Sequence, residues 1–474
     1  MATAAVTNAT ERRDAGAIQA AIGDLAKAFG NRLVTSQAVR EQHGHTTTWI
    51  ENQPPDAVVF PQHTADVQEA VRICARHKVP VIPFGTGTSL EGHVNAPQGG
   101  VSIDFRDMNR ILEVHAEDLD CVIEPGVTRK QLNEYLRDQG LFFPIDPGAD
   151  ASLGGMAATR ASGTNAVRYG TMKDNVMALK VVLANGEVMT TATRARKSSS
   201  GYDLTRLIVG SEGTLGVITE LTLKLHGIPE AIGAAICPFP TVEAACNATI
   251  LTIQSGIPVA RIELLDEVQV KACNAYSKLT LPETPLLMLE FHGTEAGVAE
   301  QSQRFGEIAA DLGGGPFEWT AKAEDRTRLW QARHDGYWAA KALRVNSQPL
   351  ASDVCVPISR LAECVVETQA DLRETGLLGP IVGHVGDGNF HVALVVDTND
   401  PKEMAATETF LSRLAERALR MGGTCTGEHG VGQGKMKYLL AEHGAPALAA
   451  MRAIKKALDP DDIMNPGKLV PADL

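Results

Sequence analysis

The chain has 474 residues, of which 44% are hydrophobic and 21% are charged, as in an ordinary soluble globular protein. Its formal net charge of -13 argues against nucleic acid and anionic lipid surfaces as main partners. No apolar stretch approaches the length of about 18 residues that a membrane-spanning helix requires, so no such helix is expected.

The first 13 residues lack the basic start and the apolar block of a secretory signal. Glu11 and Asp14 are residues that a mitochondrial transit peptide usually avoids. The eight cysteines form no CxxC pair, which indicates buried thiols in a reducing compartment. We therefore expect a cytoplasmic enzyme, and we leave peripheral membrane association and a homodimeric state open.

The first half of the chain reads as a compact α/β pattern. Residues 15–45 are predicted to be helical because their apolar residues recur at helix spacing. A boundary follows at residues 52–55, where Asn-Gln-Pro-Pro interrupts the pattern. The predicted strands and helices after it are residues 57–60, 64–77, 79–84, 101–105, 111–115, 121–124 and 125–139, and a hairpin over 176–191 that turns at Asn185-Gly186.

The second half alternates strand-like and helical blocks, which is typical of an α+β domain built on an antiparallel sheet. The expected strands are residues 234–238, 286–292, 381–384 and 391–396. The expected helices are residues 241–254, 296–312, 360–374, 402–421 and 446–458.

Three glycine-rich segments stand out, at residues 83–89, 146–163 and 209–218. The first follows a predicted strand, so its backbone amides and hydroxyl groups can approach a phosphate. It is not a GxGxxG motif, because Leu90 stands at the third glycine, and no Gly-Lys-Ser/Thr follows as in a P-loop. An ordinary turn would explain this segment alone. Three such segments together favour a long, flat, phosphorylated ligand that is buried along its length.

Residues 383–391 read Gly-His-Val-Gly-Asp-Gly-Asn-Phe-His, and Asp387-Gly388 is a strong signal for a two-residue hairpin turn. With the turn centred there, His384 lies opposite His391, with about 5 Å between the Cβ atoms. That arrangement suits two ligands of one divalent metal, and Glu428 is a candidate third ligand. Zinc, manganese and iron all fit such a set, and His429 is left for acid–base chemistry. The alternative is a tight hairpin with incidental histidines.

These segments carry a resemblance to known proteins. In order and spacing, the three glycine-rich segments resemble the FAD-binding domain of the vanillyl-alcohol oxidase superfamily. Residues 383–391, 427–432 and 465–468 resemble the C-terminal domain of FAD-linked oxidases. The combination, over about residues 50–470, is similar to the D-2-hydroxyacid dehydrogenases of the cytochrome-type D-lactate dehydrogenase and glycolate oxidase group. Residues 352–360 and 423–430 are similar to those of the D-lactate dehydrogenases.

The resemblance implies an α+β fold, with a two-part FAD-binding domain of the PCMH type and a substrate domain with an antiparallel sheet. We expect an N-terminal helical segment over residues 1–50 and the FAD-binding domain over 51–228. The substrate domain is expected over 229–425. A C-terminal helical segment, residues 426–474, is expected to return to the flavin.

The resemblance also implies which residues contact FAD, from the pyrophosphate through the flavin and ribityl chain to the adenosine. These residues are Phe84, Gly85, Thr86, Gly87, Thr88 and Ser89 for the pyrophosphate; Pro147, Gly148, Ser152, Gly154, Gly155 and Ser162 for the flavin and ribityl chain; Glu212, Gly213, Gly216 and Ile218 for the adenosine; and Asn465 for the isoalloxazine ring. Relatives with a covalent flavin carry a histidine where Thr88 stands, so we expect a non-covalent FAD. His93, one residue past that motif, is the alternative attachment site.

On the substrate side, a carboxylate is matched best by the planar fork of a guanidinium group. Arg333 lies on a probable helix with Tyr337 one turn further on, and the resemblance favours this arginine as the carboxylate clamp. The alternative is an ion pair on the helix surface. Similar D-2-hydroxyglutarate dehydrogenases carry a lysine where Ala351 stands and an asparagine where Ala393 stands. The absence of this lysine and this asparagine from the present chain implies that its substrate is a short monocarboxylic acid.

We therefore predict a flavoenzyme that oxidises D-lactate or a similar small D-2-hydroxy acid, with His429 as the base and a cytochrome, quinone or artificial compound as electron acceptor. Within the family, a glycolate oxidase FAD subunit and a D-2-hydroxyglutarate dehydrogenase are the rivals. From other classes, a flavin-dependent transferase like alkyl-glycerone-phosphate synthase and a metal hydrolase are the alternatives.

Overall fold

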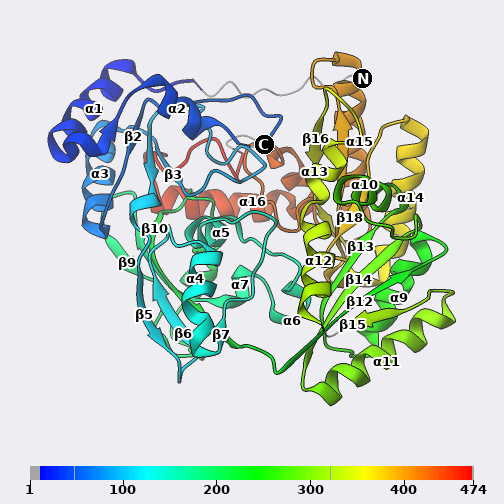
Figure 1. The fold of residues 1–474 in the computed structure, drawn as a ribbon. Helices are drawn as coiled ribbons and strands as arrows, with labels where there is room; N and C mark the ends of the chain where they lie inside the picture. The colour runs from blue at the N-terminus through cyan, green and yellow to red at the C-terminus, as the bar shows by residue number, and fades with distance from the viewer. Residues whose placement is uncertain (1–10, 47, 321, 472–474) are drawn as a thin grey trace.

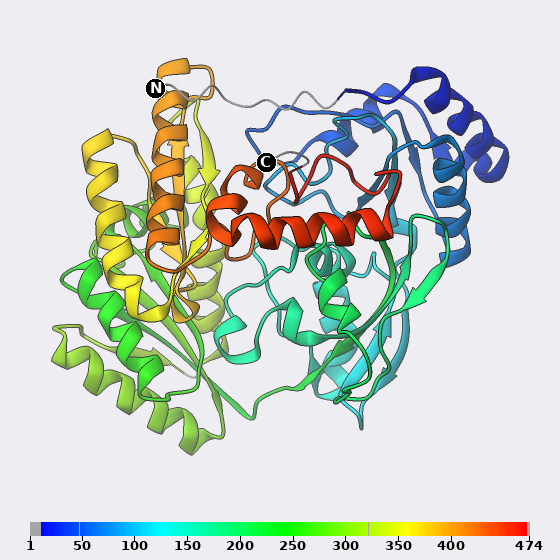
Figure 2. The same ribbon diagram turned by 180° about the vertical axis from the view of Figure 1, so that it is seen from behind.

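The computed structural model describes residues 11–46, 48–320 and 322–471, which form two lobes (Figure 1). The N-terminal half of the chain builds the first lobe and the following residues build the second lobe. The chain then returns, and α16 (Leu439–Leu458) lies across the back of the first lobe in Figure 2. This arrangement of helices and antiparallel sheets confirms the α+β fold class.

The first sheet has the strand order β1-β2-β4-β3, and its three longer strands run parallel. The helices α1 and α3 pack together, and their apolar faces share one buried core with the sheet. The bounds are α1 (Ala15–Phe29), β1 (Leu33–Val34), α2 (Gln37–Gly44), β2 (Ala57–Val59), α3 (Thr64–His77), β3 (Val81–Phe84) and β4 (Val101–Asp104). The strand β1 interrupts the helix predicted for residues 15–45, because residues 33–34 pair with β2.

The second sheet of this lobe is antiparallel, with the order β5-β6-β10-β8-β9. The hairpin predicted at Asn185-Gly186 is confirmed: Val182 pairs with Val188, and Gly186 has the positive φ of 78° that the turn requires. Its strands are β5 (Ile111–His115), β6 (Asp120–Ile123), β8 (Val176–Val182), β9 (Val188–Thr190) and β10 (Val217–Lys224). A separate two-stranded sheet pairs β7 (Leu141–Phe142) with β11 (His226–Gly227).

The helices of this part are short. Two of them lie in or just after the glycine-rich segment 146–163: α5 lies within it, and α6 follows it. The helices are α4 (Arg129–Leu136), α5 (Leu153–Thr159), α6 (Ala166–Tyr169), α7 (Met172–Asn175) and α8 (Leu204–Ile208).

The second lobe is built on an antiparallel sheet of eight strands, which confirms the predicted architecture. The strand order is β15-β12-β14-β13-β18-β19-β16, and β17 also pairs with β19. The strands are β12 (Ala231–Pro238), β13 (Val259–Leu265), β14 (Leu286–Gly293), β15 (Glu318–Thr320), β16 (Gln348–Ala351), β17 (Val354–Cys355), β18 (Ile381–Gly383) and β19 (Asn389–Val396).

Helices cover both faces of this sheet (Figure 1). Successive strand residues alternate between the two layers: Leu264 packs in the large core with one set of helices, whereas Leu265 packs with the other set. The first set is α9 (Val242–Gln254), α11 (Glu295–Asp311), α14 (Leu361–Thr375) and α15 (Pro401–Arg420). The second set is α10 (Glu267–Ser277), α12 (Ala323–His334) and α13 (Gly336–Lys341).

The C-terminal segment returns to the first sheet beside β3. The backbone N–H of Val81 donates to the carbonyl oxygen of Ile463 at 2.7 Å, and the N–H of Asn465 donates to the carbonyl oxygen of Val81 at 2.9 Å. These bonds place Asn465 beside β3, the strand that leads into the first glycine-rich segment. Among the helices of the described residues, none is long and apolar enough to cross a membrane.

Candidate active site

A cavity of about 470 Å³ is lined by both lobes and by the C-terminal segment. All of the residues predicted to contact FAD, metal or substrate line this one cavity. Its volume falls in the usual range for a buried small-molecule site. The structure therefore brings the separate motifs together, while the role of each residue stays a prediction.

The glycine-rich wall of the cavity fits a ligand with phosphate and hydroxyl groups. The buried hydroxyls of Ser89 and Ser152 have no hydrogen-bond partner among the described residues. A Cβ atom at Gly85 would lie 2.1 Å from the Ser152 Oγ, so a side chain at this position would displace the Ser152 hydroxyl. Unpaired buried hydroxyls are costly, and a bound FAD would supply their partners. The residues present thus fit the cofactor.

Glu212 and Asn465 tie the C-terminal segment to this wall. The buried Glu212 carboxylate accepts the backbone N–H groups of Val431 at 2.7 Å and Gly432 at 2.8 Å. Asn465 donates through Nδ2 to the carbonyl oxygens of Glu212 and His93. The Glu212 carboxylate is therefore used within the protein, and its contact with adenosine stays a prediction.

The hairpin that carries the metal candidates has a different register from the predicted one. Val382, not His384, pairs with His391. Residues Val385–Asp387 form a 3-10 turn, and Gly388 closes it at a φ of 79°, so the connection is longer than two residues. The register has moved by two residues, which leaves His384 and His391 on the same face. Their ring centroids lie 5.4 Å apart, so the expected closeness of the two imidazoles is correct.

His384, His391 and Glu428 form a group whose candidate ligand atoms all lie within 4.8 Å of one another. The Nε2 atoms of His384 and His391 lie 3.0 Å and 3.2 Å from Oε1 of Glu428. The other carboxylate oxygen of Glu428 is buried and has no partner within the described part of the chain. Two imidazole nitrogens and one carboxylate, one oxygen of which has no partner, fit a divalent metal.

A second group, Asp353, His391 and His429, also has its ligand atoms close together. In that group Nδ1 of His391 lies 3.7 Å from Oδ1 of Asp353, but this nitrogen already donates to the carbonyl oxygen of Ser352 at 3.0 Å. Oδ2 of Asp353 accepts two backbone N–H groups and a hydroxyl. The first group is therefore the better metal candidate, because its nitrogens face Glu428.

The imidazole of His384 lies between two carboxylates, Glu428 of this group and Glu263 of β13, and their negative charges favour a positive charge at that place. Burial alone would lower the pKa of His384, but Glu263 and Glu428 hold it well above its ordinary value. Burial alone would raise the pKa of Glu428, but His384 and His391 hold it well below its ordinary value. A divalent cation can take the place of the proton that the pair stabilises.

His429 lies beside this group and lines the cavity. Its ring stacks on His391 with a centroid distance of 4.9 Å and an interplanar angle of 10°. Burial lowers the pKa of His429 to about 4, although Asp353 acts in the opposite direction. Its Nδ1 atom is buried and finds no hydrogen-bond partner among the described residues.

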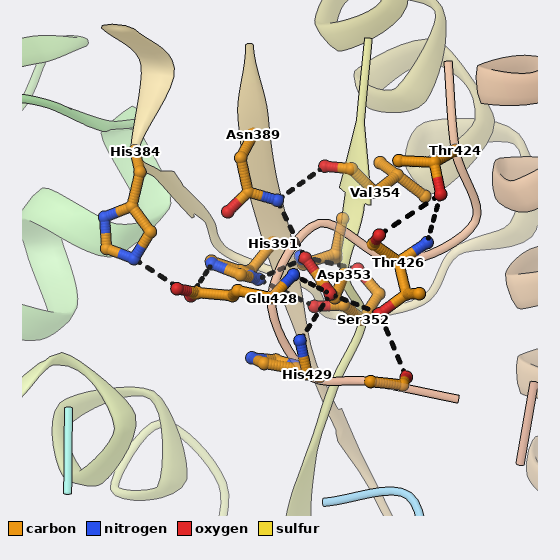
Figure 3. A network of polar contacts seen from close by, with 12 residues as sticks. Ser352, Asp353, Val354, His384, Asn389, His391, Thr424, Thr426, Glu428 and His429 are labelled. Atoms are coloured by element: carbon orange, nitrogen blue, oxygen red, sulfur yellow. Dashed lines mark hydrogen bonds and ion pairs between the residues drawn. The ribbon is translucent and has the colours of Figure 1, made fainter. Parts of the chain in front are cut away.

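Asp353 connects the His391 strand with the loop that carries Glu428 and His429 (Figure 3). Its Oδ2 accepts the backbone N–H groups of both loop residues at 2.9 Å, and its Oδ1 accepts Asn389 Nδ2 at 2.7 Å. Sequence reasoning gave Asp353 no role. The signal was an acidic residue within the conspicuous segment 352–360, but only the fold shows what it binds.

Arg333 and Tyr337 both line the cavity, on two helices rather than one: Arg333 belongs to α12 and Tyr337 to α13. Arg333 pairs with Glu263 of β13, at 2.9 Å from Nε and 2.7 Å from NH2. Arg333 is therefore ion-paired, but with a buried strand residue rather than with an acidic neighbour on the helix surface, and its role as a carboxylate clamp stays a prediction. Burial alone would raise the pKa of Glu263, but His384 and Arg333 hold it below its ordinary value.

Glu263 is a site residue that sequence reasoning missed, because the strand β13 itself was not predicted. Residues 259–265 read Val-Ala-Arg-Ile-Glu-Leu-Leu, in which two charged residues alternate with apolar ones. That alternation was the available signal for a strand with one polar face.

Two family models match the chain: the FAD binding domain over residues 55–192 and the C-terminal domain of FAD linked oxidases over residues 228–469. A protein of Danio rerio named "Probable D-lactate dehydrogenase, mitochondrial" is 52% identical over 96% of this chain and 92% of its own length. A protein of Arabidopsis thaliana named "D-lactate dehydrogenase [cytochrome], mitochondrial" is 51% identical over 95% of this chain and 80% of its own length.

Two solved structures share the fold. A p-cresol methylhydroxylase with substrate bound has a TM-score of 0.79 at 19% identity, and covers 96% of this chain and 97% of its own. An alkyldihydroxyacetonephosphate synthase has a TM-score of 0.73 at 21% identity, and covers 97% of this chain and 87% of its own. These identities show the fold alone.

Both family models and the relatives match this chain, and the cavity with its glycine-rich wall agrees with them. The chain belongs to the FAD-linked oxidases. It is an FAD-dependent oxidoreductase of the group that includes the Danio rerio and Arabidopsis thaliana proteins. Both relatives are named as mitochondrial, so the expected cytoplasmic location stays a prediction.

Proposed function

We propose that the protein oxidises D-lactate or a similar small D-2-hydroxy acid to the 2-oxo acid. The observation that carries this proposal is the shared cavity, which is lined by the glycine-rich wall, by the His384–His391–Glu428 group and by Arg333. The two relatives named as D-lactate dehydrogenases support the same substrate. FAD, when bound, supplies the acceptor for the hydride that leaves the substrate Cα.

The substrate carboxylate binds Arg333, whose planar guanidinium group can hold two carboxylate oxygens at once. Tyr337, which also lines the cavity, contacts the same part of the substrate. These contacts fix the Cα atom relative to the flavin wall, and such positioning is a large part of the rate enhancement of two-substrate reactions.

The α-hydroxyl group is placed at His384, His391 and Glu428, with His429 next to them. A divalent metal held by these three ligands, zinc, manganese or iron, would supply a Lewis acid that lowers the pKa of the hydroxyl group. His429 accepts the hydroxyl proton. The substrate thus loses one proton and one hydride, which balances the formation of the 2-oxo acid.

The cavity wall supports a short substrate. Ala351 and Ala393 both line the cavity, and each ends in a methyl group. Neither can bind a second carboxylate, so a dicarboxylic acid would bury a charge without a partner there. We propose that electrons then leave for a cytochrome, a quinone or an artificial acceptor, as the name of the Arabidopsis thaliana relative suggests for that protein.

An anaerobic flavin-reduction screen tests the proposal. The FAD-loaded protein is mixed with D-lactate, L-lactate, glycolate or D-2-hydroxyglutarate, and the flavin absorbance is followed. We expect rapid bleaching with D-lactate and little with L-lactate. If glycolate or D-2-hydroxyglutarate bleaches the flavin faster than D-lactate does, that acid is the preferred substrate instead. No bleaching by any 2-hydroxy acid would overturn the proposal in favour of the transferase alternative.

A further inference from the structure

Glu263 of β13 divides its two carboxylate oxygens between two different parts of the site. Oε1 lies 2.7 Å from Nδ1 of His384, and Oε2 lies 2.9 Å from Nε of Arg333 and 2.7 Å from its NH2. The side chain of Glu263 is completely buried, at 0% exposure. A metal-ligand candidate and the carboxylate-clamp candidate therefore share one anion that has no contact with water.

The contact with His384 sets the role of its other nitrogen. A carboxylate that accepts the Nδ1 proton fixes the tautomer and the ring orientation, and it makes Nε2 a stronger ligand. In this structure Nε2 of His384 faces Glu428 at 3.0 Å. His391 is held differently, because a backbone carbonyl oxygen accepts its Nδ1 proton. His384 is thus the ligand candidate whose basicity depends on a side-chain anion.

The contact with Arg333 sets which edge of the guanidinium group is used. Glu263 takes the Nε and NH2 side, which leaves NH1 and the second NH2 proton at the end of the side chain. Adjacent protons on NH1 and NH2 form a fork that matches a carboxylate. The pairing with Glu263 therefore orients Arg333 for end-on binding of a substrate carboxylate.

We propose that Glu263 is a positioning residue that couples the metal site to the carboxylate clamp. This inference rests on the proposed function for the identity of the two ligands. His384 and Arg333 both form ion pairs with the carboxylate of Glu263. A change at either of them therefore alters the contact that Glu263 makes with the other. Metal binding and substrate binding are then linked through the protein, without direct contact between Arg333 and the metal.

The neighbouring strand offers a matched control. Glu290 of β14 is also buried, and it lies between His292 at 2.7 Å and Arg261 at 3.6 Å. It is the register partner of Arg261, and its ion pairs in the described part of the chain are with Arg261 and His292 rather than with Arg333 or a metal-ligand candidate. Glu290→Gln therefore removes a buried carboxylate from a similar histidine–arginine setting outside the site, and it reports the structural cost alone.

The first experiment compares Glu263→Gln with Glu290→Gln in the FAD-loaded protein without substrate. Zinc affinity is measured by competition with a chromogenic chelator, together with FAD content and thermal unfolding. We expect Glu263→Gln to weaken zinc binding by about 10- to 100-fold, as for other carboxylates that orient a histidine ligand. We expect Glu290→Gln to change it less than about twofold. Equal zinc affinities in both variants would overturn the inference.

A double-mutant cycle tests the coupling itself. Arg333→Met should change zinc affinity by about threefold or more in the unaltered background and much less in the Glu263→Gln background. A direct electrostatic effect of Arg333 on the metal would persist in both backgrounds, so equal effects would overturn the coupling.

If Glu263→Gln loses FAD, Glu263→Asp serves instead: it keeps the charge but is too short to reach both partners. We expect it to weaken zinc binding too, and unchanged zinc affinity would overturn the inference.

The metal assignment and the role of Glu263 can fail separately. If the unaltered protein binds no zinc, manganese or iron, the metal assignment in the proposed function falls, and this inference falls with it. If the unaltered protein binds zinc and Glu263→Gln binds it equally well, only the role of Glu263 is lost.

Discussion

Ala351 of β16 and Ala393 of β19 are direct partners in an antiparallel strand pair, and both line the cavity. Directly paired residues have their Cβ atoms about 5 Å apart, so the two methyl groups form one small apolar patch. By the resemblance to D-2-hydroxyglutarate dehydrogenases, these two positions would carry a lysine and an asparagine in an enzyme for a dicarboxylic acid. We therefore expect the size and polarity of the acceptable acid to depend on these two positions together.

Replacing both alanines tests this dependence. The double variant Ala351→Lys, Ala393→Asn should raise kcat/KM for D-2-hydroxyglutarate about tenfold or more, because a charge-assisted hydrogen bond contributes about 1.5–3 kcal/mol. It should lower kcat/KM for D-lactate. Steady-state rates with both acids check this. The control Ala351→Met has a similar length without the charge, and an equal gain with Met would contradict the explanation.

His429→Ala should slow flavin reduction by about 10²- to 10⁴-fold, the usual contribution of a positioned base. FAD should remain bound, because the side chain lies beside the metal candidates rather than in the glycine-rich wall. Stopped-flow absorbance of the FAD-loaded variant measures the rate. His443→Ala, which changes an exposed histidine of α16 outside the cavity, is the control. An unchanged rate in His429→Ala would remove it as the base.

His384→Ala should lose the bound metal. The change removes one of three ligand candidates and leaves the buried Glu428 carboxylate without its closest cation. Elemental analysis after dialysis gives the metal content per FAD. His292→Ala is the control, because His292 is also a buried histidine bonded to a carboxylate, at Glu290. Full metal occupancy in the His384 variant would refute its assignment as a ligand.

FAD should be released when the protein is precipitated with acid, because Thr88 stands where relatives with a covalent flavin carry a histidine. The supernatant should be yellow and the pellet colourless. A yellow pellet would contradict the non-covalent attachment. His93→Ala would then tell whether His93, which lines the cavity, is the attachment site.

Asp266 should make the protein less stable as the pH rises. Burial raises the pKa of Asp266 to about 7, although it caps α10 by accepting the N–H of Gln269. The folded state therefore binds more protons than the unfolded state between about pH 4 and pH 7, so the free energy of unfolding falls as pH rises through that window, by up to about 4 kcal/mol. Asp266→Asn keeps a good cap and should flatten this fall. Thermal unfolding at pH 5 and pH 8 measures it, with Asp203→Asn at an exposed cap as control.

The local motifs of the fold and the site were predictable because each is short and contiguous. The Asn185-Gly186 turn and the strands of the antiparallel sheet follow from residue types at fixed spacing. The glycine-rich segments lie apart in the sequence, yet they line one cavity. The strand β1 was missed because two residues carry too little pattern to compete with the helices on either side.

The partners of buried charges could not be predicted. Glu263 and Asp353 each look like an isolated acidic residue in an apolar context, and their partners lie far away in the sequence. The hairpin register was wrong because a 3-10 turn and an ordinary two-residue turn have the same local composition, and packing decides between them. Gly388 shows this directly: a Cβ there would lie 2.0 Å from the carbonyl oxygen of Val356.

The return of the C-terminal segment to β3 has a consequence for assembly. Asn465 completes the wall of the cavity by bonding to the carbonyl oxygens of Glu212 and His93, although both lie in the first half of the chain. During synthesis, the first lobe emerges long before this wall can close. The wall at Asn465 is therefore complete only after both lobes have been made, so we expect stable capture of the cofactor to follow the synthesis of the second lobe.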